Sequence, residues 1–200
     1  MSRPRCERCV RPLTHCLCAL IPRLDSHHRV LLLQHPSEST HALNTARLAA
    51  LGLANVQLAV GEVFAELQSW LATSDYRPVL LFPGEGALPL DTLAADDSGT
   101  PLLLVVPDAT WRKARKLLYL NPGLDRLPKV TLRGGGVSRY RVRKAPAAEA
   151  LSTIEAVAQG LNELEGSDRF DALLRPFEAL IEGQIAAMGA ETFARNHGGG

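Results

Sequence analysis

The sequence predicts an α/β fold with a mostly parallel sheet and helices on both of its faces. Four apolar runs of strand length, at 29–34, 55–60, 78–83 and 101–107, alternate with segments whose apolar residues recur at helical spacing. Strands that are apolar along their whole length are typical of parallel sheets buried on both faces. The 200 residues, of which 46% are hydrophobic, suffice for one sizeable core.

The remaining elements follow from the same periodicity. Polar loops are expected after the first and third runs, at 35–40 and 84–91. Helical spacing predicts helices at 42–53, at 62–72, from about residue 109, at 151–164 and at 168–188. We expect Pro176 to kink the last helix, because proline removes a backbone donor inside it. Two further strands are expected at 129–133 and 138–144, around three glycines.

Three loops at strand ends carry more polar and aromatic side chains than a connection requires. They are "HPSEST" after Gln34, "PGEGA" after Phe82 and "PDATW" after Val106. In parallel sheets, ligands bind at loops that follow the carboxyl ends of strands. His35 and Glu38 are close enough in sequence to be acid–base partners, but Glu38 could equally complement the dipole of the next helix. The chain has no glycine-rich dinucleotide motif, Walker loop or serine elbow.

Asp108, Thr110 and Trp111 follow directly after the run 101–107. Aspartate is a favoured helix N-cap, so Asp108 has a structural interpretation as the start of the next helix. The indole of Trp111 can stack on a flat ring or be a half-buried core residue. Ser152 and Glu155 have the spacing of a capping box, although the exposed N–H groups of such a helix start also accept anionic groups. The residues alone leave these alternatives open.

The positive charge is concentrated in one segment of the chain. Between residues 112 and 144 lie eleven of the 22 basic residues and only one acid, Asp125, although the net charge of the whole chain is +1. A local excess of this kind predicts a polyanionic partner if the segment folds onto one face. The alternative is a solvated rim balanced by acidic helices elsewhere.

The four cysteines lie within 13 residues of one another, in the pattern C-x2-C-x6-C-x-C. Two close pairs joined by a short loop can bring four thiolates onto one tetrahedral ion, so the pattern predicts a structural zinc site. Four sulfur ligands would close the site to catalysis. Two disulfides, a C-x-x-C redox motif, or His15 as a substitute ligand are the alternatives. The predicted ligands are Cys6, Cys9, Cys16 and Cys18.

No targeting or membrane segment is evident in the sequence. The basic N-terminus lacks the apolar stretch of a signal peptide, and no apolar stretch reaches the ~20 residues of a membrane span. We therefore expect a cytoplasmic protein without a membrane partner.

The motifs taken together resemble the DTW-domain family. They are the cysteine pattern, "HPSE", "NTARL", "FPGE", "DATW", "SRYRVRK" and "STIEA", in this order between about residues 6 and 159. The family is named for an Asp-x-Thr-Trp motif, which Asp108, Thr110 and Trp111 match. The resemblance implies a zinc knuckle over 1–25 and a catalytic domain over 26–200. It relates that domain to the SPOUT class, an α/β fold that binds S-adenosylmethionine (SAM) in a knotted region.

Known family members, including the bacterial ones, are tRNA-uridine aminocarboxypropyltransferases. They transfer the 3-amino-3-carboxypropyl group of SAM to N3 of a uridine, in bacteria one in the tRNA variable loop, and release 5′-methylthioadenosine. The resemblance therefore implies that this chain is such an enzyme, with tRNA and SAM as substrates and zinc as a structural ion. The alternatives are a SAM-dependent RNA methyltransferase of the same fold, and a zinc-containing RNA-binding protein without activity.

The resemblance also suggests roles for individual residues. Asp108, Thr110 and Trp111 are the expected catalytic residues, with Asp108 as a base, an orienter of the uracil or a ligand of the SAM ammonium. The expected SAM-binding residues are Phe82, Pro83, Gly84, Val106, Pro107, Leu151, Ser152 and Thr153. The expected RNA-binding residues are Arg112, Lys113, Arg115, Arg139, Arg141 and Arg143.

Overall fold

A computed structural model describes residues 4–72, 74–94, 99–133 and 151–189. Its centre is a six-stranded sheet in the order β2-β1-β5-β3-β6-β4, in which every paired neighbour is parallel. The strands are β1 (Arg29–Gln34), β2 (Val56–Val60), β3 (Arg77–Leu81), β4 (Leu88–Pro89), β5 (Leu102–Asp108) and β6 (Lys129–Thr131). The predicted α/β class and the parallel sheet are confirmed.

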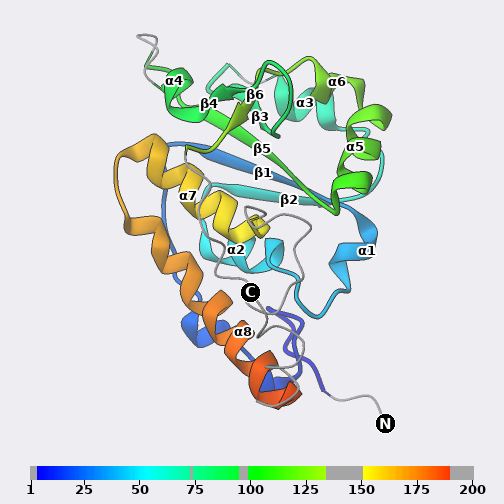
Figure 1. Cartoon of the computed structure of the whole chain (residues 1–200), viewed down its shortest axis with the longest axis vertical. Helices are drawn as coiled ribbons and strands as arrows, with labels where there is room; N and C mark the ends of the chain where they lie inside the picture. The colour runs from blue at the N-terminus through cyan, green and yellow to red at the C-terminus, as the bar shows by residue number, and fades with distance from the viewer. Residues whose placement is uncertain (1–3, 73, 95–98, 134–150, 190–200) are drawn as a thin grey trace.

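Helices cover both faces of this sheet (Figure 1). The α-helices are α1 (Pro36–Ser39), α2 (Ala46–Gly52), α3 (Leu67–Leu71), α4 (Leu90–Ala94), α5 (Trp111–Leu120), α6 (Pro122–Asp125), α7 (Thr153–Glu165) and α8 (Leu174–Met188). The 3₁₀ helices are η1 (Leu13–His15), η2 (Cys18–Leu20) and η3 (Arg169–Leu173). Helices α3, α5 and α6 lie on one side of the sheet, and α2 and α7 lie on the other.

Alternation along the strands divides the core into two clusters. Leu32 and Leu104 pack with α2, α7 and α8, whereas Leu33 and Leu103 face α3, α5 and α6. Successive side chains of a strand point to opposite faces, so an apolar run supplies both clusters at once. This is why the central strands could be recognised from unbroken apolar sequence.

Two predicted helices begin later than their periodicity suggests, because side chains hold the residues in front of them. The segment 62–72 is helical only in α3, since Asn121 donates to the Glu62 carbonyl (2.8 Å) and accepts from the Phe64 amide (3.0 Å). The segment 42–53 is helical only in α2, and the side chain of Asn44 accepts from the Arg47 amide at 3.1 Å. Side-chain bonds to the backbone compete with helix formation in this way.

Two further expectations need correction. The segment 84–91, expected to be a loop, contains β4 and the start of α4. Pro176 does not kink a continuous helix; η3 ends at Leu173, and Pro176 lies in the first turn of α8. In the first turn of a helix, the missing proline N–H costs no intrahelical hydrogen bond.

The strand expected at 138–144 lies outside the described residues, and so does the segment 134–150 that follows β6. No feature of the described residues tests the SPOUT-like knot, which stays a prediction. Among the helices of the described residues, none combines the length and the apolar character needed to cross a membrane.

Gly160 allows α7 to lie close to the sheet, which gives a test of the packing. A Cβ at this position would lie 3.3 Å from Leu104 Cδ2 and 3.5 Å from Leu90 Cδ2. We expect Gly160→Val to lower the free energy of unfolding by about 1–3 kcal/mol, because two extra methyl groups overpack this interface. Gly183→Val in α8, where a Cβ meets open space, should change it by less than about 0.5 kcal/mol. Urea unfolding measures both, and equal losses would contradict this account.

Candidate functional site

Strands β1 and β5 are neighbours at the centre of the sheet, and Gln34 is in register with Asp108. After β1 the chain continues to β2 on one side, whereas after β5 it crosses through α5 to β6 on the other side. The chain thus diverges from the carboxyl ends of these two strands. Ligands of open α/β sheets bind at such a topological switch point.

The carboxylate of Asp108 is at this switch point and is nine-tenths buried, with 9% of the residue exposed. Its Oδ2 accepts a hydrogen bond from Gln34 Nε2 at 2.6 Å. Its Oδ1 accepts one from the hydroxyl of Thr153, the first residue of α7. A buried carboxylate needs such partners, and the start of a helix adds a favourable dipole. The structure therefore brings the predicted residues Asp108 and Thr153 into direct contact.

Gln34 and Asn44 support this carboxylate and were not predicted. The amide group of Gln34 donates one hydrogen to Asp108 and the other to Asn44 Oδ1 at 3.1 Å. Asn44 Nδ2 returns a bond to Gln34 Oε1 at 3.4 Å. Gln34 is 1% exposed, so its polar group is buried at the end of an otherwise apolar strand. A glutamine that ends such a run is the signal in the sequence that could have identified it.

The cap of α5 is Thr110, and Asp108 does not have that role. The side chain of Thr110 makes no capping hydrogen bond, and the carboxylate of Asp108 is directed to Gln34 and Thr153. The structural interpretation of Asp108 as a helix N-cap is therefore wrong.

Trp111 and Phe82 form an aromatic pair at the ends of β5 and β3. Their ring centroids are 5.6 Å apart with an interplanar angle of 63°, an edge-to-face arrangement. Trp111 remains 42% exposed. An exposed indole that is held by only part of its surface can stack on a flat ligand.

The other residues expected to bind SAM lie around the same strand ends. Pro83 and Gly84 are exposed, and Pro107 is half-buried in β5 beside Leu33. The side chain of Val106 packs into the core. Their SAM contacts stay predictions.

The two residues before α7 differ from each other. Ser152 is buried and forms the predicted capping box, in which its amide and its hydroxyl both donate to Glu155 Oε2 at 2.8 and 2.6 Å. Leu151 instead lines an open cleft of about 560 Å³ with Glu155, Arg133 and Asp171. Among the described residues, Asp108 and Trp111 are not part of the lining of this cleft, although Leu151 lies two residues before Thr153, which bonds Asp108.

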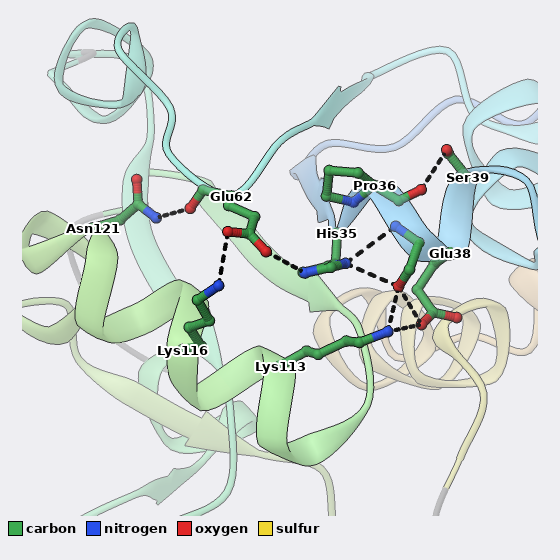
Figure 2. A network of polar contacts seen from close by, with 9 residues as sticks. His35, Pro36, Glu38, Ser39, Glu62, Lys113, Lys116 and Asn121 are labelled. Atoms are coloured by element: carbon green, nitrogen blue, oxygen red, sulfur yellow. Dashed lines mark hydrogen bonds and ion pairs between the residues drawn. The ribbon is translucent and has the colours of Figure 1, made fainter.

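A polar network joins the loops after β1 and β2 to α5 (Figure 2). His35 Nδ1 accepts from the Ser37 amide at 3.1 Å, which assigns its hydrogen to Nε2, and Nε2 donates to Glu62 Oε1 at 2.8 Å. Glu62 also accepts from Lys116 at 2.9 Å. Glu38 is paired with Lys113 at 3.7 Å instead of with His35. The suggested His35–Glu38 partnership is therefore replaced by His35–Glu62.

The basic residues of α5 fall into two groups. Lys113 and Lys116 are engaged with Glu38 and Glu62. The side chains of Arg112 and Arg115 are exposed and make no hydrogen bond or ion pair within the described residues. Arg139, Arg141 and Arg143 lie outside the described residues. Within α5, only the two arginines thus present uncompensated charge to a polyanion.

The four cysteine sulfurs converge as the spacing predicts. They lie within 4.8 Å of one another, with Cys6 and Cys18 at 3.6 Å and Cys9 and Cys16 at 3.8 Å, and they are free thiols. Zn–S bonds near 2.3 Å in a tetrahedron place sulfurs about 3.8 Å apart, so the cluster fits zinc. Backbone hydrogen bonds from Cys9 and Arg8 lower the pKa of the Cys6 thiol to about 6, whereas burial and the hydrogen bond to Cys6 raise the pKa of Cys18 to about 12, so the two thiols titrate as an interacting pair.

Glu62 gives the network a pH dependence. Hydrogen bonds from Lys116 and His35 hold the pKa of Glu62 below its usual value near 4.5. A lowered carboxyl pKa stabilises the folded state above the unfolded value, and this contribution is lost as pH falls through the folded pKa. We therefore expect Glu62→Gln to lose less Tm than the wild type between pH 6 and about pH 3. Thermal unfolding across this range measures the effect, and Glu66→Gln, at an exposed acid nearby, should follow the wild type.

Comparison with known proteins connects this geometry to a family. Residues 3–185 match the DTW domain. A Drosophila melanogaster protein named tRNA-uridine aminocarboxypropyltransferase 2 is 34% identical over 92% of this chain and 76% of its own length. The Mus musculus protein of that name is also 34% identical, over 92% of this chain and 64% of its own length.

An Arabidopsis thaliana protein named tRNA-uridine aminocarboxypropyltransferase A is 28% identical over 82% of this chain and 73% of its own length. No solved structure matches the chain. These relatives are from animals and a plant, so they support the expected family but do not test the expectation that the chain is a bacterial member. Because the match covers nearly the whole sequence, the chain belongs to the DTW-domain family.

Proposed function

We propose that this protein is a tRNA-uridine aminocarboxypropyltransferase that uses SAM as the donor. The observation that carries the proposal is the 34% identity, over 92% of the chain, to a relative with that name. The uridine belongs to the tRNA variable loop in this proposal, and the second product is 5′-methylthioadenosine. The enzyme is cytoplasmic and acts without a membrane.

The reaction forms a bond between uracil N3 and the methylene carbon of the aminocarboxypropyl arm, and breaks the bond from that carbon to sulfur. The N3 of uracil carries a proton at neutral pH, so the reaction profits from a base. Asp108 is that base in our proposal, because Gln34 and Thr153 fix both of its oxygens at the strand ends. Alignment of the arm with N3 supplies much of the remaining acceleration.

The residues around Asp108 bind the two substrates. Trp111 packs edge-to-face with Phe82 and keeps part of its indole exposed, and the adenine or the uracil packs on this exposed part. Thr110 lies between Asp108 and Trp111 and orients either substrate. The proposed SAM site comprises Phe82, Pro83, Gly84, Val106, Pro107, Leu151, Ser152 and Thr153.

The tRNA backbone contacts the exposed arginines. Arg112 and Arg115 follow Trp111 on α5 and place positive charge next to the proposed uracil site. Lys113, Arg139, Arg141 and Arg143 complete the proposed RNA-binding set, although Lys113 is also paired with Glu38. The uridine must be presented outward from folded tRNA to reach Asp108. Phosphate contacts should make the affinity fall as salt concentration rises.

The cysteine cluster holds a structural zinc ion in this proposal. Residues 1–25 form the zinc knuckle and residues 26–200 the catalytic domain, which is SPOUT-like. Cys6, Cys9, Cys16 and Cys18 are the ligands. Four thiolates fill a tetrahedral site, so the ion supports the fold and takes no part in transfer.

The donor group can be identified with two labelled forms of SAM. We expect label from the carboxyl carbon to enter tRNA, and label from the methyl carbon to leave in methylthioadenosine, because the transferred arm includes the former only. Measuring tRNA-bound label after purification decides the matter. Label that enters only from the methyl carbon would identify an RNA methyltransferase. RNA binding without SAM binding in calorimetry would identify an RNA-binding protein without activity.

Asp108→Asn tests the proposed base. The substitution keeps the size of the side chain but removes its ability to accept the N3 proton, so kcat should fall by about 10²-fold or more. tRNA affinity should stay near the wild-type value, since Asp108 does not contact the phosphates. Asp125→Asn, at an exposed acid paired with Lys129, is the matched control and should retain full activity. Wild-type turnover by Asp108→Asn would exclude Asp108 as a base or an orienting group.

A further inference from the structure

One guanidinium joins the cysteine segment to the candidate site. Arg11 lies between Cys9 and Cys16, and its side chain crosses to the loop between α1 and α2. Its Nη1 donates to the carbonyl of Ala42 at 2.8 Å, and Nη2 donates to the carbonyl of Asn44 at 3.4 Å. Hydrogen bonds from a charged donor are stronger than those between neutral groups. Arg11 thus holds the main chain of residues 42–44.

The loop that Arg11 holds carries the support of Asp108. The side chain of Asn44 bonds the amide of Gln34 in both directions. Gln34 in turn donates to Asp108 Oδ2 at 2.6 Å. A continuous series of hydrogen bonds therefore leads from Arg11 through Asn44 and Gln34 to the Asp108 carboxylate.

The position of Arg11 is set by the turn that carries the first two cysteines. The Val10 amide donates to the Cys6 carbonyl, and the Cys6 amide donates to the Arg11 carbonyl, both at 2.8 Å. Val10 has a φ of 61°, a left-handed conformation that is unfavourable for a β-branched residue. Such a backbone persists only where its surroundings impose it. A metal ion bound by the sulfurs of Cys6 and Cys9 would close this turn.

We propose that Arg11 is a positioning residue through which the metal-bound cysteine segment holds the Asn44–Gln34–Asp108 series in place. When the turn is closed, the guanidinium fixes residues 42–44 and the Gln34 amide is directed at Asp108. When the turn opens, Arg11 withdraws and the loop is released. Arg11 touches neither substrate, so its effect on transfer is indirect. The catalytic consequence rests on the proposed function, but the structural consequence does not.

The structural part is tested with the full chain loaded with zinc, by hydrogen exchange of the amides in 41–47. Arg11→Ala should accelerate their exchange by about tenfold or more, because it removes the charged bonds that hold the loop. Arg8→Ala is the matched control, since Arg8 is exposed on the same turn and should leave exchange unchanged. Zinc content, measured by a colorimetric chelator, should be the same in both variants. Wild-type exchange at 41–47 in Arg11→Ala would overturn the proposal.

Removal of the metal tests the coupling itself. Treatment with a chelator, or Cys9→Ser, should accelerate exchange at 41–47 in the wild type but add little in Arg11→Ala. If zinc removal accelerates exchange equally in both backgrounds, Arg11 does not transmit the state of the turn and the proposal fails. Arg11→Ala keeps all four cysteines, so chelator treatment of the wild type and of Arg11→Ala can still be compared if Cys9→Ser does not fold.

Kinetics separate positioning from RNA contact. Arg11→Ala should lower kcat and leave KM for tRNA unchanged, and Arg11→Lys should recover part of the loss by restoring one charged donor. A raised KM with unchanged kcat would make Arg11 a phosphate contact and would contradict the positioning role. If the wild type transfers nothing to tRNA, the proposed function fails while the exchange experiment still decides the role of Arg11.

Discussion

The carboxylate of Asp108 is the group on which the site depends, because a buried carboxylate must be hydrogen-bonded in the folded protein. Two of its donors among the described residues come from different layers: Gln34 ends a central strand, and Thr153 begins a helix on one face of the sheet. The parallel pairing of β1 and β5 brings Gln34 and Asp108 into register across 74 residues of sequence. The order of the strands and the position of α7 therefore determine whether the Asp108 carboxylate meets its donors. The packing of the apolar core fixes the same two features.

Helix α5 separates two uses of positive charge. Lys113 binds Glu38 of α1, which follows β1, and Lys116 binds Glu62 of the loop after β2, so the two lysines connect α5 to the segments after both strands (Figure 2). At about 100° per residue, Arg112, Arg115 and Tyr119 fall together on another part of the helix surface, and Tyr119 is 84% exposed. Surface ion pairs contribute little stability each, which is consistent with a role in orienting loops. The run of basic residues in α5 thus contains lysines that form ion pairs within the protein and arginines whose side chains are unpaired within the described residues.

The sequence identified the strands that supply apolar side chains to the core and failed where side chains far apart determine the local structure. The apolar runs predicted β1, β3 and β5 closely because both faces of these strands are covered. The expected helix at 62–72 was too long because Asn121, nearly 60 residues away, binds the backbone at its start. The cysteine ligands converge locally, so their spacing sufficed. The partners of Asp108 and of His35 depend on the order of strands in the sheet, and the periodicity of apolar residues along the sequence does not predict that order.

Asp108 is supported from two sides, and the aromatic pair beside it is not. On one side Gln34, Asn44 and Arg11 form a continuous series, and on the other the capping box of Ser152 and Glu155 fixes the turn that presents Thr153. A group that accepts a proton gains from such support, because small displacements of reacting groups are costly. Trp111, which is partly exposed, touches Phe82 by an edge and can adjust to a ring placed on it. The contacts that fix a side chain are thus concentrated at Asp108, where proton transfer requires a fixed carboxylate. Trp111, where a flat substrate would bind, has fewer such contacts.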